Sequence, residues 1–317
     1  MRSGNSAVAT APMESRMRIL ITGATGFIGT ALSAHLHRQG HEIWAVSRSG
    51  AAAASRLPAV ARVFDWDPLG GPPNGEVFDG VEAVVHLAGE SVAGRWGAAQ
   101  RDAIETSRVV GTRNLVAGMA AVRTRPRILV SSSAIGYYGD RGDEKLSETS
   151  SAGDDFLAHV GKGWEASAIE AEALGMTVVR FRTGIVLGAG GGALKEMLLP
   201  AKLGLGGPLG SGQQWWSWIH MGDAIGVIEH ALTFNSSAVL NTTAPEPVRQ
   251  RDFARAMGRV LRRPAVAPAP AFILKLVLGG FAAELLSSKR VVPAATMASG
   301  YSYRYPELAG ALEAVLG

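Results

Sequence analysis

The chain has 317 residues, 47% of them hydrophobic and 18% charged, a composition that favours a folded globular protein over a disordered one. It contains no cysteine, which excludes disulfides, a thiolate nucleophile and cysteine-bound metal centres, and fits the reducing conditions of the cytoplasm. The 31 basic and 27 acidic residues are scattered, so we expect a mildly basic surface and no nucleic acid partner.

Neither of two segments of the chain has the pattern of a targeting signal or a membrane span. Residues 1–16 are small and polar and lack the apolar core of a signal peptide, so we expect a flexible leader. The one long apolar segment, residues 272–286, carries Lys275 and Glu284 and is shorter than the ~20 residues that a bilayer requires. We therefore expect no membrane partner.

A strand, a glycine turn and a helix follow one another near the start of the chain. Residues 19–22 are apolar and β-forming, the turn at 23–29 has the spacing Gly-x-x-Gly-x-x-Gly, and residues 30–36 have helical spacing. The N–H groups and dipole of a helix N-terminus attract a phosphate, and glycine lets the backbone approach it closely. A second strand at 42–46 completes the pattern of a dinucleotide site, with a purely structural turn as the alternative. The predicted cofactor contacts here are Gly23, Thr25, Gly26, Phe27 and Ile28.

The end of the second strand indicates which dinucleotide binds. In NAD-binding folds an acid at this place bonds the ribose hydroxyls, whereas an arginine suits a 2′-phosphate. Here there is no acid and Arg48 follows the strand. Because a guanidinium pairs with a phosphate in bidentate fashion, the sequence favours NADP(H) as the cofactor. A surface arginine at a strand end is the alternative.

Two further strand ends supply candidate contacts. The strand at 61–64 is followed by Asp65 and Trp66, which could flank an adenine ring or form a solvated turn. The buried strand that begins at residue 83 runs into a turn of small residues, and Glu90 and Arg95 then open the substrate side of the cleft. Arg95 is a candidate anion contact, with a surface residue as the alternative. The residues expected to form a wall beside the cofactor are Leu87, Ala88 and Gly89.

Strands and helices alternate regularly through most of the chain. After the first two strands the pattern predicts a helix at 98–121, a strand at 127–130, a helix at 156–174, a strand at 176–181, a helix at 221–232 and a strand at 239–242. This order is typical of an α/β fold with a Rossmann-type doubly wound parallel sheet. We expect a Rossmann domain at residues 17–184, completed by about 217–245.

The remaining segments, residues 185–216 and 246–317, predict a smaller, mainly helical C-terminal lobe that covers the cleft and contacts the substrate. The glycine run at 204–212 lacks a strand before it and a helix after it, so we reject it as a phosphate loop. Three tryptophans at 215, 216 and 218 cannot all face one core, which makes Trp218, with His220, a candidate substrate contact. The seven histidines are dispersed and predict no metal site.

Several separated motifs point to one known family. They lie at residues 22–29, 86–90, 164–165, 182–188, 204–212, 218–220 and 304–306. With them, the chain from Met17 onward resembles the extended short-chain dehydrogenase/reductase superfamily, and within it the atypical sugar-nucleotide-epimerase-like family with a C-terminal domain of unknown function. The resemblance implies a further cofactor contact at Gly184 and a homodimer formed through two long helices.

The resemblance also implies a catalytic set. In this superfamily a tyrosine exchanges a proton with the substrate, a lysine four residues later lowers the pKa of that tyrosine, and a serine lies nearby. Ser133 matches the serine and Tyr138 the tyrosine of a Tyr-Gly pair just beyond it, so these two are candidate catalytic residues. At the expected places of the Tyr/Lys pair stand Leu157 and Gly161, neither of which can transfer a proton. Tyr137 is an alternative hydroxyl donor.

Two functions follow. The first is an NADP(H)-dependent oxidoreductase or epimerase that acts on a hydroxyl or carbonyl carbon of a small molecule, with a nucleotide sugar as one candidate substrate. The second is a non-catalytic NADP(H)-binding protein with a regulatory or partner-binding role, which the loss of the Tyr/Lys pair favours.

Overall fold

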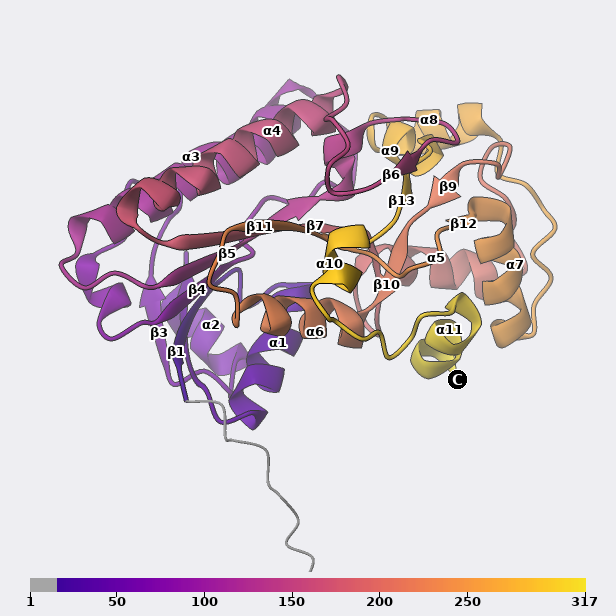
Figure 1. Ribbon diagram of the computed structural model, residues 1–317. Coiled ribbons are helices and arrows are strands. Elements are labelled where there is room, and N and C mark those ends of the chain that lie inside the picture. The colour runs from indigo at the N-terminus through magenta and orange to yellow at the C-terminus, as the bar shows by residue number, and fades with distance from the viewer. Residues whose placement is uncertain (1–15) are drawn as a thin grey trace, which may run out of the picture.

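The computed structural model describes residues 16–317, so the expected leader lies, apart from Arg16, outside the described residues. At its centre is a seven-stranded sheet with the order β11-β7-β5-β4-β1-β2-β3, in which every neighbouring pair is parallel (Figure 1). The strands are β1 (Arg18–Thr22), β2 (Glu42–Ser47), β3 (Arg62–Asp65), β4 (Ala83–His86), β5 (Ile128–Ala134), β7 (Thr177–Thr183) and β11 (Ala238–Thr242).

Helices cover both faces of this sheet, because parallel strands built from continuous apolar runs must be buried on both sides. On one face Leu32 and Ile228 join the core, and on the other Leu115 and Ala168 do so. The helices of the first face are α1 (Phe27–Arg38), α2 (Gly50–Arg56) and α6 (Met221–Ala231), and those of the second are α3 (Ala98–Ala121) and α4 (Phe156–Ile169). The predicted Rossmann-type doubly wound sheet is confirmed. Its strand order reverses between β1 and β4, where such folds bind ligands.

Apart from α6 and β11, the elements beyond β7 form the predicted, mainly helical lobe at one end of the sheet (Figure 1). Its core gathers Leu194, Phe253 and Leu312 from three helices around the buried Trp216 and Trp218. The helices are α5 (Gly192–Lys202), α7 (Gln250–Leu261), α8 (Ala271–Leu278), α9 (Phe281–Leu286), α10 (Ala294–Ala298) and α11 (Leu308–Leu316). Short strand pairs join them: β8 (Ile185–Leu187) with β10 (Trp218–His220), β9 (Trp215–Trp216) with β12 (Val248–Arg249), and β13 (Arg290–Val291) with β6 (Lys145–Leu146).

One predicted helix and the long apolar segment are each divided in the structure. The helix expected at 156–174 is α-helical only to Ile169 and continues as a 3-10 helix, Glu170–Leu174, that ends at a left-handed Gly175. The apolar segment at 272–286 is divided into α8 and α9, since Gly279, with a φ of +57°, and Gly280 interrupt it. Among residues 16–317, no helix is both long and apolar enough to cross a membrane.

The C-terminal tail is fastened to α6 by one buried carboxylate. Asp223, 1% exposed, accepts hydrogen bonds from the hydroxyl of Tyr301 at 3.1 Å and from the backbone N–H groups of Arg304 and Tyr305 at 2.8 and 2.9 Å. These contacts explain physically why a motif at residues 304–306 accompanies the motifs of the Rossmann domain, because α6 covers the sheet itself.

Candidate functional site

Backbone contacts shape the glycine turn between β1 and α1. Gly23 has a φ of +69°, and a Cβ atom there would lie 2.8 Å from the backbone nitrogen of Ala88. A Cβ atom on Gly29 would lie 2.2 Å from the carbonyl oxygen of Gly23, so only glycine fits where α1 leaves the turn. Within residues 16–317, no side chain caps the N-terminus of α1 at Gly26. The first N–H groups of this helix are therefore suited to donate to a phosphate.

A cleft of about 420 Å³ lies beside this turn, at the carboxyl edge of β1, β2 and β4. The predicted cofactor residues that line it are Gly23, Thr25, Gly26, Arg48, Trp66, Leu87, Ala88 and Gly89. Glu90, predicted for the substrate, lines it too. The lining residues that sequence reasoning missed are Thr22, Val46, Ser47, Asp67, Pro68, Leu69, Ala103 and Ser107. The cleft thus combines a phosphate-binding turn with the reversal of strand order, the geometry of a dinucleotide site.

Two acids at the end of β3 have different surroundings. Oδ1 of Asp65 accepts the backbone N–H of Gly50 at 2.7 Å, at the start of α2, whereas Asp67 lines the cleft. The ring of Trp66 is 6% exposed, and its indole N–H donates to the carbonyl of Gly71 at 3.0 Å, which fixes the ring in the cleft wall. Asp67 accepts the N–H of Leu69 at 3.1 Å, an Asx turn that its place before a proline could have indicated.

The rim of the cleft at the end of β2 is basic. Arg48 is exposed and lines the cleft there. A second arginine, Arg56 of α2, donates from Nη2 to the carbonyl oxygen of Thr25 in the glycine turn at 3.3 Å. Two guanidinium groups from neighbouring segments are therefore available near the phosphate-binding turn.

Three predicted cofactor residues have packing contacts instead. Phe27 lies against glycines of the C-terminal lobe, so that a Cβ atom on Gly191 would lie 2.3 Å from Phe27 Cδ2. Ile28 packs against the core on the α1 face of the sheet. A Cβ atom on Gly184 would lie 2.5 Å from the carbonyl oxygen of Ser217, so glycine is needed where β7 leads into β8. Phe27 and Gly184 thus pack where the Rossmann domain meets the lobe, and Ile28 packs in the core of the Rossmann domain.

A buried histidine lies under the cleft wall. His86 is 0% exposed; its Nδ1 is 2.7 Å from Oγ1 of Thr22 and its Nε2 is 2.9 Å from Oγ1 of Thr112. Thr22 Oγ1 also accepts the N–H groups of Leu87 and Ala88, so its proton goes to Nδ1, and Nε2 donates to Thr112. Burial, helped by the charge of Arg108, lowers the pKa of His86 to about 4. The neutral imidazole thus ties α3 to the strand ends that hold the cleft wall.

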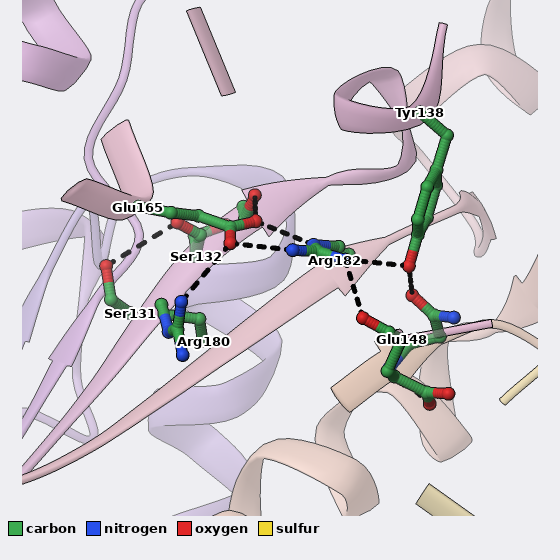
Figure 2. A network of polar contacts seen from close by, with 9 residues as sticks. Ser131, Ser132, Tyr138, Glu148, Glu165, Arg180 and Arg182 are labelled. Atoms are coloured by element: carbon green, nitrogen blue, oxygen red, sulfur yellow. Dashed lines mark hydrogen bonds and ion pairs between the residues drawn. The ribbon is translucent and has the colours of Figure 1, made fainter. Parts of the chain in front are cut away.

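The two candidate catalytic residues lie in a buried polar network, of which Figure 2 labels Tyr138, Glu165 and Arg182. Ser133, 2% exposed, donates to Glu165 Oε1 at 2.7 Å, and Glu165 forms two hydrogen bonds of 2.7 and 2.9 Å with Arg182. Arg182 donates to the hydroxyl of Tyr138 at 2.9 Å, and that hydroxyl donates to Oδ1 of Asn241 at 2.7 Å. Burial would lower the pKa of Arg182, but the hydrogen bonds and charge of Glu165 outweigh it and raise that pKa.

This network does not favour Tyr138 as a proton donor to a substrate. Its side chain is 0% exposed, and its hydroxyl is engaged by Arg182 and Asn241. Burial raises the pKa of Tyr138 to about 12, although the neighbouring Arg182 opposes this. Sequence spacing missed the network because Glu165, Arg182 and Asn241 meet only in the folded chain.

The places of the missing Tyr/Lys pair are packed against the segment 135–138, a 3-10 helix. A Cβ atom on Gly161 would lie 3.3 Å from Cα of Tyr137, and one on Gly136 would lie 3.2 Å from Cβ of Leu157. Tyr137 is partly exposed, and Cζ of Arg182 lies 3.5 Å from the centre of its ring. Tyr137 therefore lies beside the position that carries lysine in the superfamily.

Three of the four predicted substrate residues have contacts within the protein. Arg95 donates to the carbonyl oxygens of Leu276 and Val277 at 2.5 and 3.3 Å and so caps α8. Trp218 is 0% exposed. His220 accepts the N–H of Gly222 at 3.0 Å as the N-cap of α6, and burial lowers its pKa. Glu90 alone of the four lines the cleft.

Comparison with known proteins agrees with this geometry. Residues 19–241 match the model of the NAD dependent epimerase/dehydratase family. The chain belongs to this family. Residues 269–315 match a domain of unknown function, DUF1731, which comprises α8 to α11. The predicted family, with its own C-terminal domain, is confirmed.

Relatives are similar over almost the whole chain. The epimerase family protein SDR39U1 of Bos taurus is 39% identical over 95% of this chain and all of its own length. A homologue from Arabidopsis thaliana, named as chloroplastic, is 37% identical over 96% of this chain and 88% of its own. The crystal structure of human SDR39U1 (isoform 2) with NADPH has a TM-score of 0.84 and 37% identity, and covers 95% of this chain and 99% of the human one.

Proposed function

We propose that the chain binds NADP(H) in this cleft and catalyses hydride transfer at a hydroxyl or carbonyl carbon of a small molecule, with a nucleotide sugar as one candidate. The observation that carries the cofactor assignment is the exposed Arg48 at the rim of a cleft whose floor is the glycine turn. The NADPH in the human relative supports it. The bound cofactor would supply the hydride donor or acceptor.

Different residues of the cleft would bind different parts of the cofactor. The turn at Gly23 and Gly26 would hold the pyrophosphate at the N-terminus of α1. Arg48 would pair with the 2′-phosphate, while Trp66 and Asp67 flank the adenine end of the cleft. The wall at 87–89 would lie beside the nicotinamide end, held in place through Thr22 and His86.

Arg48→Ala is expected to raise the Kd for NADPH by about 10- to 100-fold and to leave the Kd for NADH nearly unchanged, because a guanidinium–phosphate contact is worth about 1.5–3 kcal/mol. Fluorescence titration with both cofactors measures this. Arg38→Ala, in the last turn of α1 and not among the residues that line the cleft, is the matched control. Equal affinity of the unmodified protein for NADPH and NADH would remove the basis for this role of Arg48.

We assign the proton transfer to Tyr137 rather than to Tyr138. Tyr137 is partly exposed, and the guanidinium of Arg182 packs against its ring and holds it beside Gly161, the place that carries lysine in the superfamily. Tyr137→Phe is expected to lower kcat by about 100-fold or more, with the NADPH affinity kept. Tyr138→Phe, which removes a buried hydroxyl from the network, should chiefly lower stability. Steady-state kinetics and thermal unfolding of both variants separate the two roles, and an unchanged kcat for Tyr137→Phe refutes this one.

The second candidate function is NADP(H) binding without turnover. The burial of Tyr138 and Ser133, together with Leu157 and Gly161 at the superfamily's catalytic places, favours it. A screen of nucleotide sugars and small carbonyl compounds with NADPH-loaded protein distinguishes the two functions. Tight NADPH binding with no turnover on any of them would favour the binding protein. The homodimer and the cytoplasmic location stay predictions.

A further inference from the structure

Exposed apolar side chains concentrate in the C-terminal lobe. Of the eleven large hydrophobic residues that are exposed among residues 16–317, eight lie between residues 199 and 277. Val266, Phe272 and Leu276 are 78, 71 and 70% exposed. We call the most exposed set the apolar rim, which consists of Leu199, Leu203, Leu205, Val266, Phe272 and Leu276. An apolar surface of this kind on a folded protein is typical of an interaction site.

The apolar rim is built from neighbouring segments. The end of α5 meets the end of α7, where Nε of Arg263 donates to the carbonyl of Lys202 at 2.9 Å. From there residues 203–210 run beside residues 264–270, and Leu209 and Ala269 form a parallel β-bridge. Residue 270 leads directly into α8. In Figure 1 the three helices α5, α7 and α8 all belong to the lobe at one end of the molecule, with α8 above the other two.

The contacts that hold α8 in place do not use its apolar side chains. None of its eight residues is buried. Its last turn is instead capped by Arg95, and Gly280 behind it packs closely on Trp96, where a Cβ atom would lie 2.8 Å from Cβ of the tryptophan. The described part of the chain therefore fixes this helix while leaving Phe272 and Leu276 uncovered.

The charge around the apolar rim is strongly positive. Residues 195–205 and 262–277 contain five basic residues and one acidic residue, Glu196. All six side chains are exposed. The basic residues are Lys195, Lys202, Arg262, Arg263 and Lys275. Apolar side chains flanked by exposed cations are complementary to a membrane surface rich in anionic lipids.

We propose that the apolar rim docks the protein peripherally onto an anionic lipid surface. The apolar side chains enter the interface while the five cations pair with lipid headgroups. A second copy of the chain fits less well, because a symmetric contact brings identical patches, and so like charges, together. Peripheral docking needs no spanning helix, and the proposal departs here from the sequence-based expectation of no membrane partner. The rim residues do not line the NADP(H) cleft, so this docking is independent of the cofactor site.

Vesicle sedimentation of the full chain tests this docking. We expect binding to phosphatidylcholine vesicles that contain about 30% phosphatidylserine, and at least tenfold weaker binding to phosphatidylcholine alone. Raising the salt concentration from about 0.1 M to about 1 M should weaken binding to the anionic vesicles, because the Debye length falls from about 10 Å to about 3 Å.

Variants identify the surface. Phe272→Ser with Leu276→Ser, and separately Lys202→Glu with Lys275→Glu, should each reduce binding to the anionic vesicles at least tenfold. The matched controls Met297→Ser, an exposed apolar residue outside the rim, and Arg123→Glu, an exposed cation on another segment, should bind as the unmodified protein does. NADPH titration verifies that every variant is folded. No binding by the full chain, equal loss in the controls, or a dimer that the rim variants dissociate without any vesicle binding would overturn the proposal.

Discussion

Glu165→Ala is expected to destabilise the fold by about 3–5 kcal/mol, the cost of leaving a buried cation without its partner. Glu165 and Arg182 are 4 and 3% exposed and share two hydrogen bonds. Without the carboxylate, the guanidinium keeps only Tyr138 and the carbonyl oxygen of Glu148 as acceptors. Ser133 loses its acceptor as well. Urea unfolding at neutral pH measures the loss.

A double variant distinguishes this explanation from simple loss of packing. In Glu165→Leu with Arg182→Met neither charge remains, so its free energy of unfolding should exceed that of Glu165→Ala. Glu170→Ala is the matched control, because its ion pair with Arg113 is more than half exposed and contributes less than about 1 kcal/mol. A Glu165→Ala protein as stable as the control would mean that the network is not a stabilising element.

His86 is expected to make stability depend on pH below neutrality. Its pKa is about 4 in the folded protein and near 6.5 when unfolded, so the unfolded chain binds a proton that the folded protein rejects. The contribution of the neutral ring is complete above about pH 6.5 and is lost as the pH falls through about 4. The difference corresponds to roughly 3 kcal/mol.

The measurement is urea unfolding at a series of pH values between about 7 and 4. His86→Gln should lower stability at neutral pH, because it disturbs the contacts with Thr22 and Thr112. It should also reduce the slope of the unfolding free energy against pH, by an amount that corresponds to the uptake of up to one proton on unfolding. His37→Gln, on the exposed end of α1, should keep the slope of the unmodified protein. A slope unchanged in His86→Gln would show that this histidine titrates alike in both states.

The sheet and the cofactor cleft could be predicted because their signals are local. A buried strand is a short apolar run, and a phosphate-binding turn is a run of glycines between a strand and a helix. Side chains that act across the fold have no such signal. Asn241 meets Tyr138 from 103 residues away, and Arg95 caps a helix 181 residues further along. Sequence position alone suggested that Tyr138 and Arg95 face ligands.

The roles of acids and tryptophans near strand ends also depend on contacts across the fold, which have no local sequence signal. Asp65 and Asp67 are two residues apart, and only the position of α2 decides that Asp65 accepts the Gly50 N–H while Asp67 lines the cleft. Trp218 was expected at the cleft, but the lobe's helices enclose it, and Trp215 is the tryptophan of the three that stays partly exposed.

The fastening of the C-terminal tail to Asp223 has a consequence for synthesis on the ribosome. The carboxylate belongs to α6, yet its three partners, at residues 301, 304 and 305, are synthesised 78, 81 and 82 residues later. Until then α6 carries an acid that its neighbours will later bury, so the nascent Rossmann domain can form its sheet but not seal this face. Burial of Asp223 on this face of the fold therefore has to follow the synthesis of residues 301–305.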